Sequence, residues 1–261
     1  MNIPIYQIDA FTTQVFKGNQ AAVCVLESWL DDATLQNIAA ENNLAETAFI
    51  IKTKGGYDLR WFTPTLEIDL CGHATLASAY VIFKFLEPKL SHVVFSSMSG
   101  KLFVSLEESG RLAMDFPART PTQLPIPAQA ENAFGVAPKE VWASDDLMMV
   151  FETEAQVLNL TPNMSAISTF TDYFALIATA KGDKVDFVSR FFAPNAGIPE
   201  DPVTGRAHCT LVPYWAEQLN KTKLEAKQLS KRTGHLYCED KGQRVAIAGY
   251  AKLFLKGEIH L

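Results

Sequence analysis

The chain has 261 residues, of which 48% are hydrophobic and 20% are charged. This composition excludes an intrinsically disordered chain, because there is ample apolar surface to bury in one large or two medium domains. The 29 acidic and 23 basic residues leave a net charge of −6. A protein that binds nucleic acid or an anionic membrane surface by charge usually has a basic excess, so we expect neither partner.

The sequence predicts neither a membrane span nor a targeting segment. The longest apolar stretch, at 74–83, ends at Lys84 and is too short to cross a bilayer. The N-terminus lacks a basic region followed by an uninterrupted apolar run. We therefore expect a cytoplasmic protein.

Signals for a metal or nucleotide are missing as well. The cysteines Cys24, Cys71, Cys209 and Cys238 form no C-x-x-C pair, and the histidines have no ligand spacing with them. We expect reduced, mostly buried thiols, no metal site and no cofactor. Dinucleotide, P-loop, nucleophile-elbow and zinc-protease motifs are also absent.

The first half of the chain begins with β-rich runs around one helix. Asp31 or Asp32 is placed to cap this helix, whose apolar positions include Leu35 and Ile38. A second, wholly apolar helix follows from residue 74. Alternating or β-branched runs predict strands at 3–9, 21–26, 47–51, 59–62, 93–97, 101–107 and 111–116.

A proline-rich stretch at 116–128 separates this half from a second one, because proline restricts the backbone to extended conformations. The second half has a similar order of elements. We predict helices at 162–167 and in part of 205–219. Strands are predicted at 141–144, 147–151, 173–178, 185–192, 245–248 and 251–255.

Two pairs of segments show that the halves are related. Arg-Trp-Phe-Thr-Pro at 60–64 resembles Arg-Phe-Phe-Ala-Pro at 190–194, and Asp-Leu-Cys-Gly-His-Ala at 69–74 resembles Asp-Pro-Val-Thr-Gly-Arg-Ala at 201–207. Two copies at this separation predict two pseudo-symmetric domains, 1–117 and 118–261, with a ligand cleft between them. The last strand is a candidate to cross back to the first domain.

Each half has a glycine at the predicted start of its helix, Gly72 in the first and Gly205 in the second. Glycine lets a ligand approach the backbone, and free amides of a first helical turn favour an anion such as a carboxylate. The alternative is that both are plain turns joining strand to helix.

Three groups near these turns are candidates for proton transfer: Glu46, His73 and Asp201. Glu46 lies within an apolar run, where burial would raise its pKa and suit it to act as a base near neutral pH. The alternatives are structural: a half-exposed strand residue for Glu46, a helix-start histidine for His73 and a turn or cap for Asp201.

Several of these segments together resemble the PhzF family of phenazine-biosynthesis-like isomerases, and they span nearly the whole chain in the same order. The resemblance implies an α+β diaminopimelate-epimerase-like fold, in which each domain wraps a twisted mixed sheet around a buried helix. The matching segments are Phe-Lys-Gly-Asn-Gln-Ala-Ala-Val at 16–23, Ala-Glu-Thr-Ala-Phe at 45–49, the pentapeptide at 60–64, Asp-Leu-Cys-Gly-His-Ala-Thr at 69–75, Phe-Phe-Ala-Pro at 191–194, Asp-Pro-Val-Thr-Gly at 201–205 and Tyr-Trp at 214–215.

The resemblance also implies roles for individual residues. Glu46 matches the glutamate that shuttles a proton, and His73 and Asp201 match polar groups that orient the substrate. Asn19, Gly72 and Gly205 are assigned to substrate binding. We expect no cofactor. Members of the family are often dimers, so a homodimer is an open expectation.

Arg206 departs from the family pattern, which usually has serine after Thr-Gly. A cation at a helix start is unfavourable unless an anion is nearby. We assign Arg206 to substrate binding, through a two-pronged contact with a carboxylate. The alternatives are a neighbouring acid, such as Asp201 or Glu200, or solvent.

We therefore expect a cofactor-independent isomerase, with Glu46 moving a proton between carbons of a small unsaturated carboxylate in the interdomain cleft. One alternative is an amino-acid racemase or epimerase that uses Cys71. It is disfavoured because Thr204 stands where such enzymes have a second thiol. The other alternative is a ligand-binding relative without catalysis, which would not need Glu46.

Overall fold

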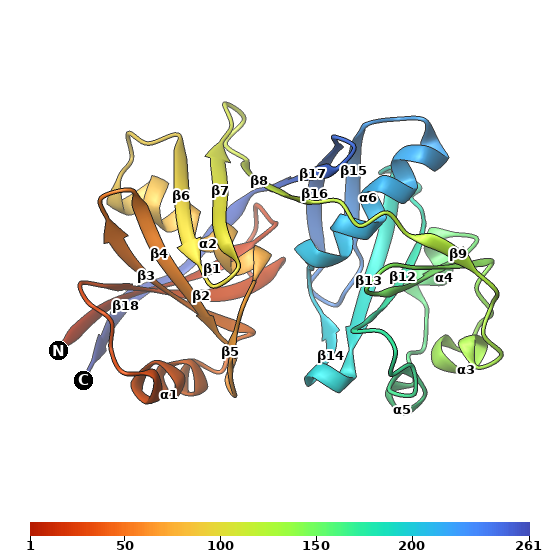
Figure 1. The fold of residues 1–261 in the computed structure, drawn as a ribbon, viewed down its shortest axis with the longest axis horizontal. Coiled ribbons are helices and arrows are strands. Elements are labelled where there is room, and N and C mark those ends of the chain that lie inside the picture. The colour runs from red at the N-terminus through yellow and green to blue at the C-terminus, as the bar shows by residue number, and fades with distance from the viewer. The chain divides into compact units, whose positions relative to one another are not determined.

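The computed structural model describes residues 1–261, and the chain separates into two compact units (Figure 1). One unit comprises Met1–Asp115 and Ala248–Leu261, and the other comprises Phe116–Ile247. We expected the end of the chain to belong to the second half, with a last strand that crosses back to the first domain as an alternative. In the structure this segment belongs to the first unit, because β18 (Ala251–His260) forms a long antiparallel ladder with β1 (Asn2–Ala10).

The first unit is a mixed sheet with a helix inside it. Strands β2 and β3 are parallel and joined through α1, whose start is capped by Asp31 accepting a hydrogen bond from the amide of Thr34. Strands β4 and β6 are also parallel and are joined through α2. The elements are β2 (Asn19–Leu26), α1 (Asp32–Asn42), β3 (Glu46–Thr53), β4 (Gly56–Phe62), β5 (Glu67–Ile68), α2 (Gly72–Val81), η1 (Ile82–Leu86), β6 (His92–Ser97), β7 (Gly100–Leu106) and β8 (Leu112–Pro117).

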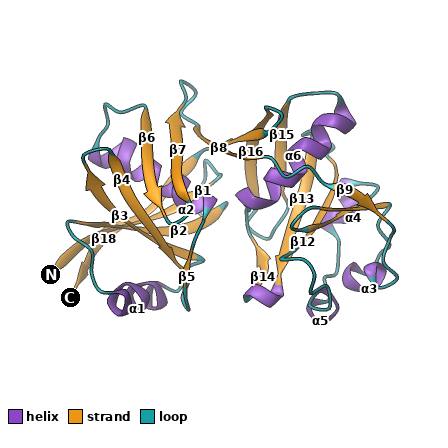
Figure 2. Ribbon diagram, viewed as in Figure 1, coloured by secondary structure: helices purple, strands orange, loops and turns teal.

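Helix α2 is surrounded because it has no polar face. Its residues from His73 to Ala79 are all buried, and the helix contacts β1, β2, β3 and β18 (Figure 2). The hydroxyls of Thr75 and Ser78 donate back to carbonyls one turn earlier, which satisfies them without solvent. The predicted buried helix is thus confirmed, although its last turn, η1, is π-helical.

The second unit repeats this order. Strands β11 and β12 are parallel, β12 and β13 antiparallel, and β13 and β15 parallel with α6 between them. The elements are β9 (Thr122–Leu124), α3 (Ala130–Phe134), β10 (Glu140–Ala143), β11 (Leu147–Val150), α4 (Glu154–Leu158), α5 (Met164–Ile167), β12 (Leu176–Lys181), β13 (Phe187–Ala193), η2 (Pro194–Ala196), β14 (Ile198–Asp201), α6 (Gly205–Leu219), β15 (Lys223–Gln228), β16 (Gly234–Asp240) and β17 (Arg244–Gly249).

The two related pentapeptides occupy equivalent places in the two units. Arg60 on β4 forms a two-pronged ion pair with Glu67, with both nitrogen–oxygen distances 2.7 Å. Arg190 on β13 pairs with Glu200 in the same way, at 2.7 and 3.0 Å. Each guanidinium lies 5.1 Å from the ring of the phenylalanine two residues later. The sequence repeat therefore corresponds to a repeated sheet and a repeated Arg–Glu pair, and the α+β class is confirmed.

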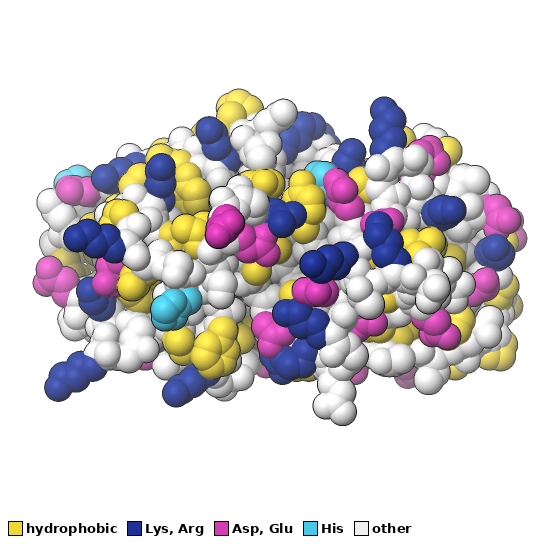
Figure 3. Space-filling view, turned by 90° about the horizontal axis from the view of Figure 1, so that it is seen from above, with side chains coloured by type: hydrophobic (Ala, Val, Ile, Leu, Met, Phe, Trp, Pro, Cys, Tyr) yellow, Lys and Arg dark blue, Asp and Glu magenta, His cyan; other side chains and the backbone are white.

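The visible face in Figure 3 has acidic and basic side chains interspersed, with apolar groups between them. Such mixing avoids a large field of one sign. No helix combines the length and the apolar character needed to span a bilayer.

His208 in α6 makes the stability of the protein depend on pH. The residue is fully buried, its Nδ1 lies 2.8 Å from the carbonyl oxygen of Thr204, and burial lowers its pKa to about 4. In the unfolded chain it takes up a proton near the ordinary histidine pKa of 6.5. The neutral imidazole therefore makes its full contribution to the free energy of unfolding above pH 6.5. This contribution is lost as the pH falls toward 4.

Between pH 7 and pH 4, we expect the free energy of unfolding of wild type to fall by about 3 kcal/mol more than that of His208→Thr. Threonine is chosen because Thr75, its equivalent in α2, makes the same backward hydrogen bond. Urea unfolding at several pH values measures the difference, with the exposed His92→Asn as control. Parallel pH curves for wild type and His208→Thr would contradict the assignment.

Candidate functional site

Glu46 lies where two parallel strands of the first unit begin. It is the first residue of β3 and is opposite Ala21 of β2 in the ladder. Asn19 is the first residue of β2. Since parallel strands begin at the same edge of a sheet, this register places the carboxylate and the amide near each other.

The start of α2 supplies the other groups. Cys71 is the residue before the helix, and no side chain caps the helix there. Gly72 and His73 are its first two residues, so their amides have no partner within the helix. Gly72 does not have a positive φ, and neither does Gly205 at the start of α6. The conformational freedom of glycine is therefore not what these two turns require.

The side chains meet at the imidazole of His73. Its Nε2 lies 2.9 Å from Oε2 of Glu46. On the other side of the ring, Nδ1 lies 3.2 Å from Nδ2 of Asn19 and 3.5 Å from Sγ of Cys71. Glu46, Cys71 and His73 are only 7%, 6% and 5% exposed. The result is a buried cluster of titratable groups, which we call the Glu46–His73–Cys71 cluster.

One contact in the cluster is close but not aligned. Oε2 of Glu46 and Nε2 of His73 are both buried, and neither has a partner in hydrogen-bond geometry. The 2.9 Å contact between them is therefore electrostatic, and it lacks the directional N–H···O alignment of a hydrogen bond. Buried polar atoms without a directed hydrogen bond are unusual in proteins, which marks this pair as a candidate functional group.

The environment also sets the protonation of the cluster. Burial, with a further contribution from Glu46, raises the pKa of the Cys71 thiol, which keeps it protonated at neutral pH. Burial by itself lowers the pKa of His73. The neighbouring Cys71 and Glu46 outweigh this effect, and the net shift is upward. A proton on His73 is thus favoured while Glu46 is a carboxylate.

In the second unit, Asp201 belongs to a turn that leads into α6. The hydroxyl of Thr204 donates to Oδ2 of Asp201, and the amide of Thr204 donates to Oε1 of Gln228 at 2.9 Å. Nε2 of Gln228 donates to the carbonyl of Asp201 at 2.8 Å. The fully buried Gln228 therefore holds this turn from a strand 24 residues away, which no local motif indicates.

Arg206 has an internal partner. Its Nε and Nη2 lie 3.0–3.1 Å from the carboxylate of Asp146, which is fully buried. Its guanidinium also lies 4.5 Å from the ring of Phe174. The neighbouring-acid alternative is the one that the structure shows, but the acid is neither Asp201 nor Glu200. The two-pronged contact that we expected a substrate carboxylate to receive is made to Asp146.

The structure thus gathers four predicted site residues in the first unit: Asn19, Glu46, Gly72 and His73. Asp201 and Gly205 lie at the start of α6 in the second unit. Sequence reasoning missed the contacts of Gln228, Asp146 and Cys71. The first two come from other strands, so only the folded chain reveals them. Cys71 is next to the helix start and was a candidate base only in the alternative racemase reaction, and its spacing of two from His73 was the signal for their contact.

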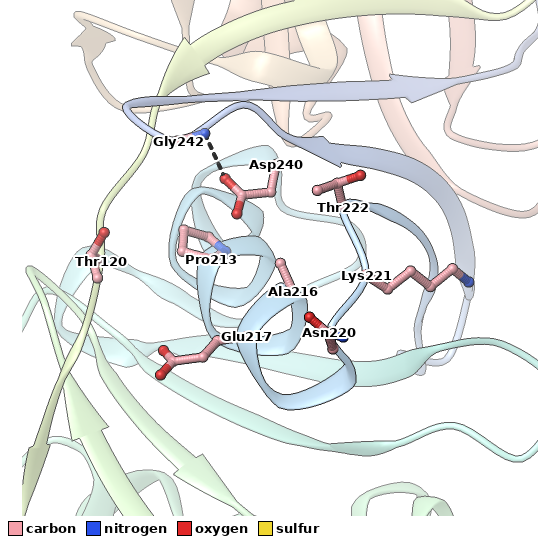
Figure 4. Close-up of a pocket in the computed structure, with 9 residues that line it drawn as sticks. All are labelled: Thr120, Pro213, Ala216, Glu217, Asn220, Lys221, Thr222, Asp240 and Gly242. Carbon is pink, nitrogen blue, oxygen red and sulfur yellow. Dashed lines mark hydrogen bonds between the residues drawn. The ribbon is translucent and has the colours of Figure 1, made fainter.

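A surface pocket of about 400 Å³ lies at the other end of α6 (Figure 4). Its lining includes Pro213, Glu217, Asn220 and Asp240. The helix has 15 residues, so this end is about 21 Å from Gly205. None of the predicted site residues lines the pocket, and we do not assign the function to it.

Comparison with known proteins gives consistent results. The profile of the family described as phenazine biosynthesis-like protein matches residues 8–257. A protein from Pseudomonas aeruginosa named as an uncharacterized isomerase is 46% identical over the full length of both chains. A crystal structure of a PhzF-family protein from Enterococcus faecalis has a TM-score of 0.98 and 50% identity, with 100% of both chains covered.

A more distant likeness concerns the fold alone. A hydroxyproline epimerase from Agrobacterium vitis has a TM-score of 0.60 at 7% identity, with 99% of this chain and 92% of that chain covered. Together with the close relatives, it identifies the architecture as diaminopimelate-epimerase-like.

The pair between Arg206 and Asp146 leads to a prediction about stability. Arg206→Ser leaves the buried carboxylate of Asp146 without this arginine. We therefore expect the free energy of unfolding to fall by about 3 kcal/mol. This is the low end for breaking a buried pair, because the arginine side chain is one-third exposed. The double variant Arg206→Ser/Asp146→Asn also removes the charge of residue 146. It should recover at least half of the free energy of unfolding that Arg206→Ser loses. Denaturant unfolding of wild type, both single variants and the double variant measures the coupling. Strictly additive losses would show that the pair is not coupled.

Proposed function

The chain belongs to the phenazine biosynthesis-like family, and we propose that it is a cofactor-independent isomerase that moves a proton between two carbons of a small, unsaturated carboxylate. The observation that carries this proposal is the buried carboxylate of Glu46, 2.9 Å from the imidazole of His73 at the start of an apolar helix. Burying a carboxyl group and an imidazole removes them from water, which costs free energy. A pair kept in spite of this cost is a candidate for a chemical role.

In the proposed reaction, the carboxylate of Glu46 removes a proton from a carbon next to the unsaturated system. The electron pair of the broken C–H bond moves into that system, toward the substrate carboxylate. Glu46, now protonated, delivers a proton to a different carbon and becomes a carboxylate again, so that no atom or electron is gained or lost. In deuterated water the carboxyl proton exchanges with solvent before delivery in part of the turnovers, and the substrate then carries deuterium. A glutamate of this kind serves as base and then as acid.

His73 and the first turn of α2 support these steps. The imidazole lies 2.9 Å from Oε2 of Glu46 and positions that side chain. The free amides at the helix start attract negative charge, and they are oriented before the substrate arrives. We assign Gly72 to this role because it supplies one of those amides. Asn19 contacts His73, so it orients the imidazole and need not touch the substrate.

In the second unit, we propose that Asp201 orients the substrate. Its carboxylate accepts a hydrogen bond from Thr204, and Gln228 holds the backbone of the same turn. Gly205 begins α6 directly after this turn and offers the same kind of helix-start amide as Gly72. Arg206, which is engaged by Asp146, is left out of this proposed assignment.

A second candidate is an amino-acid racemase or epimerase in which Cys71 exchanges the proton. The observation in its favour is the distance of 3.5 Å between Sγ of Cys71 and Nδ1 of His73, which would let the imidazole accept the thiol proton. Two features oppose it. Burial raises the pKa of Cys71, and the equivalent residue before α6 is Thr204, a poor base toward carbon.

We expect Glu46→Gln to reduce turnover by about 10²–10⁴-fold, because glutamine keeps the shape of the side chain but cannot exchange a proton as a base. The measurement is incorporation of deuterium from deuterated water into a panel of small cyclic and amino-acid carboxylates. Glu152→Gln, an exposed glutamate of the second unit, is the matched control. Undiminished exchange in Glu46→Gln would assign Glu46 a structural role only.

Cys71→Ala separates the two candidate reactions. An isomerase that depends on Glu46 should keep its turnover within about tenfold, since only a neighbour of His73 is lost. A racemase that uses the thiol should lose about 10²-fold or more. The same deuterium assay measures both results, and the position of the label in the recovered carboxylate shows which carbon exchanged.

A further inference from the structure

The turn that leads into α6, at residues 201–204, is held along its whole length by the hairpin of β15 and β16. Gln228, the last residue of β15, contacts Asp201 and Thr204 at the two ends of this turn. Between them, the carbonyl of Pro202 accepts a hydrogen bond from the hydroxyl of Ser230 at 2.8 Å. We propose that Gln228 is a positioning residue, which acts through Thr204 to present the carboxylate of Asp201 to the substrate.

Val203, the remaining residue of the turn, is held by its shape. It is fully buried, and Gly234 at the start of β16 lies against it. A Cβ atom added to Gly234 would lie 2.2 Å from Cγ2 of Val203, so a larger residue at 234 would displace the turn. Each of the four residues of the 201–204 turn is therefore in contact with the hairpin.

The direction of each hydrogen bond follows from what its partners can donate. The backbone amide of Thr204 can only donate, so the atom of Gln228 that it meets at 2.9 Å must be the oxygen, Oε1. The other terminal atom, Nε2, then donates to the carbonyl of Asp201 at 2.8 Å and to Oγ1 of Thr204 at 3.1 Å. Both N–H bonds of this side chain are used, and its orientation is fixed.

The hydroxyl of Thr204 is thereby given one direction. Because Oγ1 accepts a hydrogen bond from Gln228, its own proton is left for Oδ2 of Asp201. This chain of hydrogen bonds, which we call the Gln228 relay, makes Oδ2 an acceptor and fixes its position. Gln228 is 0% and Thr204 7% exposed, which limits competition from water.

The first unit builds an equivalent turn without such a relay. The ladders of β4 with β6 and of β13 with β15 correspond, and their registers place Ser97 where the second unit has Gln228. The hydroxyl of Ser97 donates to the carbonyl of Gly100 within its own hairpin. Before α2, the carbonyl of Asp69 accepts a hydrogen bond from the exposed Ser99 instead. The packing of a sheet around a central helix therefore does not require the relay.

The consequence for the proposed reaction is preorganisation. A carboxylate that orients a substrate is most effective when its oxygen is in place before the substrate arrives. A buried side-chain amide that uses all of its hydrogen bonds has one conformation, and it restricts the groups bonded to it in the same way. This inference rests on the substrate-orienting role that we propose for Asp201.

Thr204→Val cuts the relay but leaves the backbone amide of residue 204 bonded to Gln228. Valine has nearly the shape of threonine without the hydroxyl, so Asp201 loses its donor. With a carboxylate that wild type labels in deuterated water, we expect KM to rise by about tenfold and kcat to stay within about threefold. Thr204→Ser, which keeps the hydroxyl, should recover most of this loss.

Gln228→Leu removes the relay together with the hold on the turn. We expect KM to rise by about 100-fold, and the amide of Thr204 to exchange with deuterated water at least about tenfold faster by NMR. In Thr204→Val the amide of residue 204 should stay protected, because Oε1 of Gln228 still accepts its hydrogen bond. Gln218→Leu, at an exposed glutamine of α6, is the matched control and should resemble wild type in both measurements.

A purely structural role would reduce the fraction of active protein, and thus lower kcat at an unchanged KM. That result for Thr204→Val would overturn the proposal, as would a Thr204→Ser variant no better than Thr204→Val. Unchanged exchange of the Thr204 amide in Gln228→Leu would also overturn it. If Gln228→Leu is not folded by circular dichroism, the two threonine variants decide the question. Wild type that labels no carboxylate would contradict the isomerase proposal and this inference together, whereas the other results contradict this inference alone.

Discussion

The absence of a polar face on α2 is the constraint on which the first unit depends. A helix that is apolar on every side is stable only where other elements cover it completely, so strands pack around it from both ends of the chain. Strand β18 returns from the other end of the chain and pairs with β1, one of the strands that cover the helix. It also brings the start of the helix, with Cys71 and His73, to the edge where β2 and β3 begin.

The same burial makes the cluster chemically unusual. A carboxyl group, an imidazole and a thiol lie in surroundings that disfavour charge, and the contacts of His73 with Cys71 and Glu46 outweigh the effect of burial on its pKa. The burial of α2 and the close contact of Glu46 with His73 therefore arise from one packing arrangement.

The second unit shows what a shared architecture leaves free to change. Both units keep a two-pronged Arg–Glu pair on an equivalent strand, β4 in the first and β13 in the second. At the helix starts, however, the residues differ: Thr204 replaces the cysteine and Arg206 replaces the histidine. The positive charge of Arg206 is neutralised by Asp146 from the second unit. The two halves thus keep the same packing but carry different chemical groups.

The sequence by itself determined the α+β class, the pairing of two related halves and the buried helix, because apolar periodicity and repeated motifs are local properties. It also indicated Glu46 and His73 as candidate groups. Only the tertiary structure decided that they meet at 2.9 Å and that Arg206 is engaged by Asp146. These contacts join residues 27 and 60 positions apart. They depend on the register of the strands and on the place at the sheet edge where each helix begins. Residues that are neighbours in the sequence do not determine either of these features.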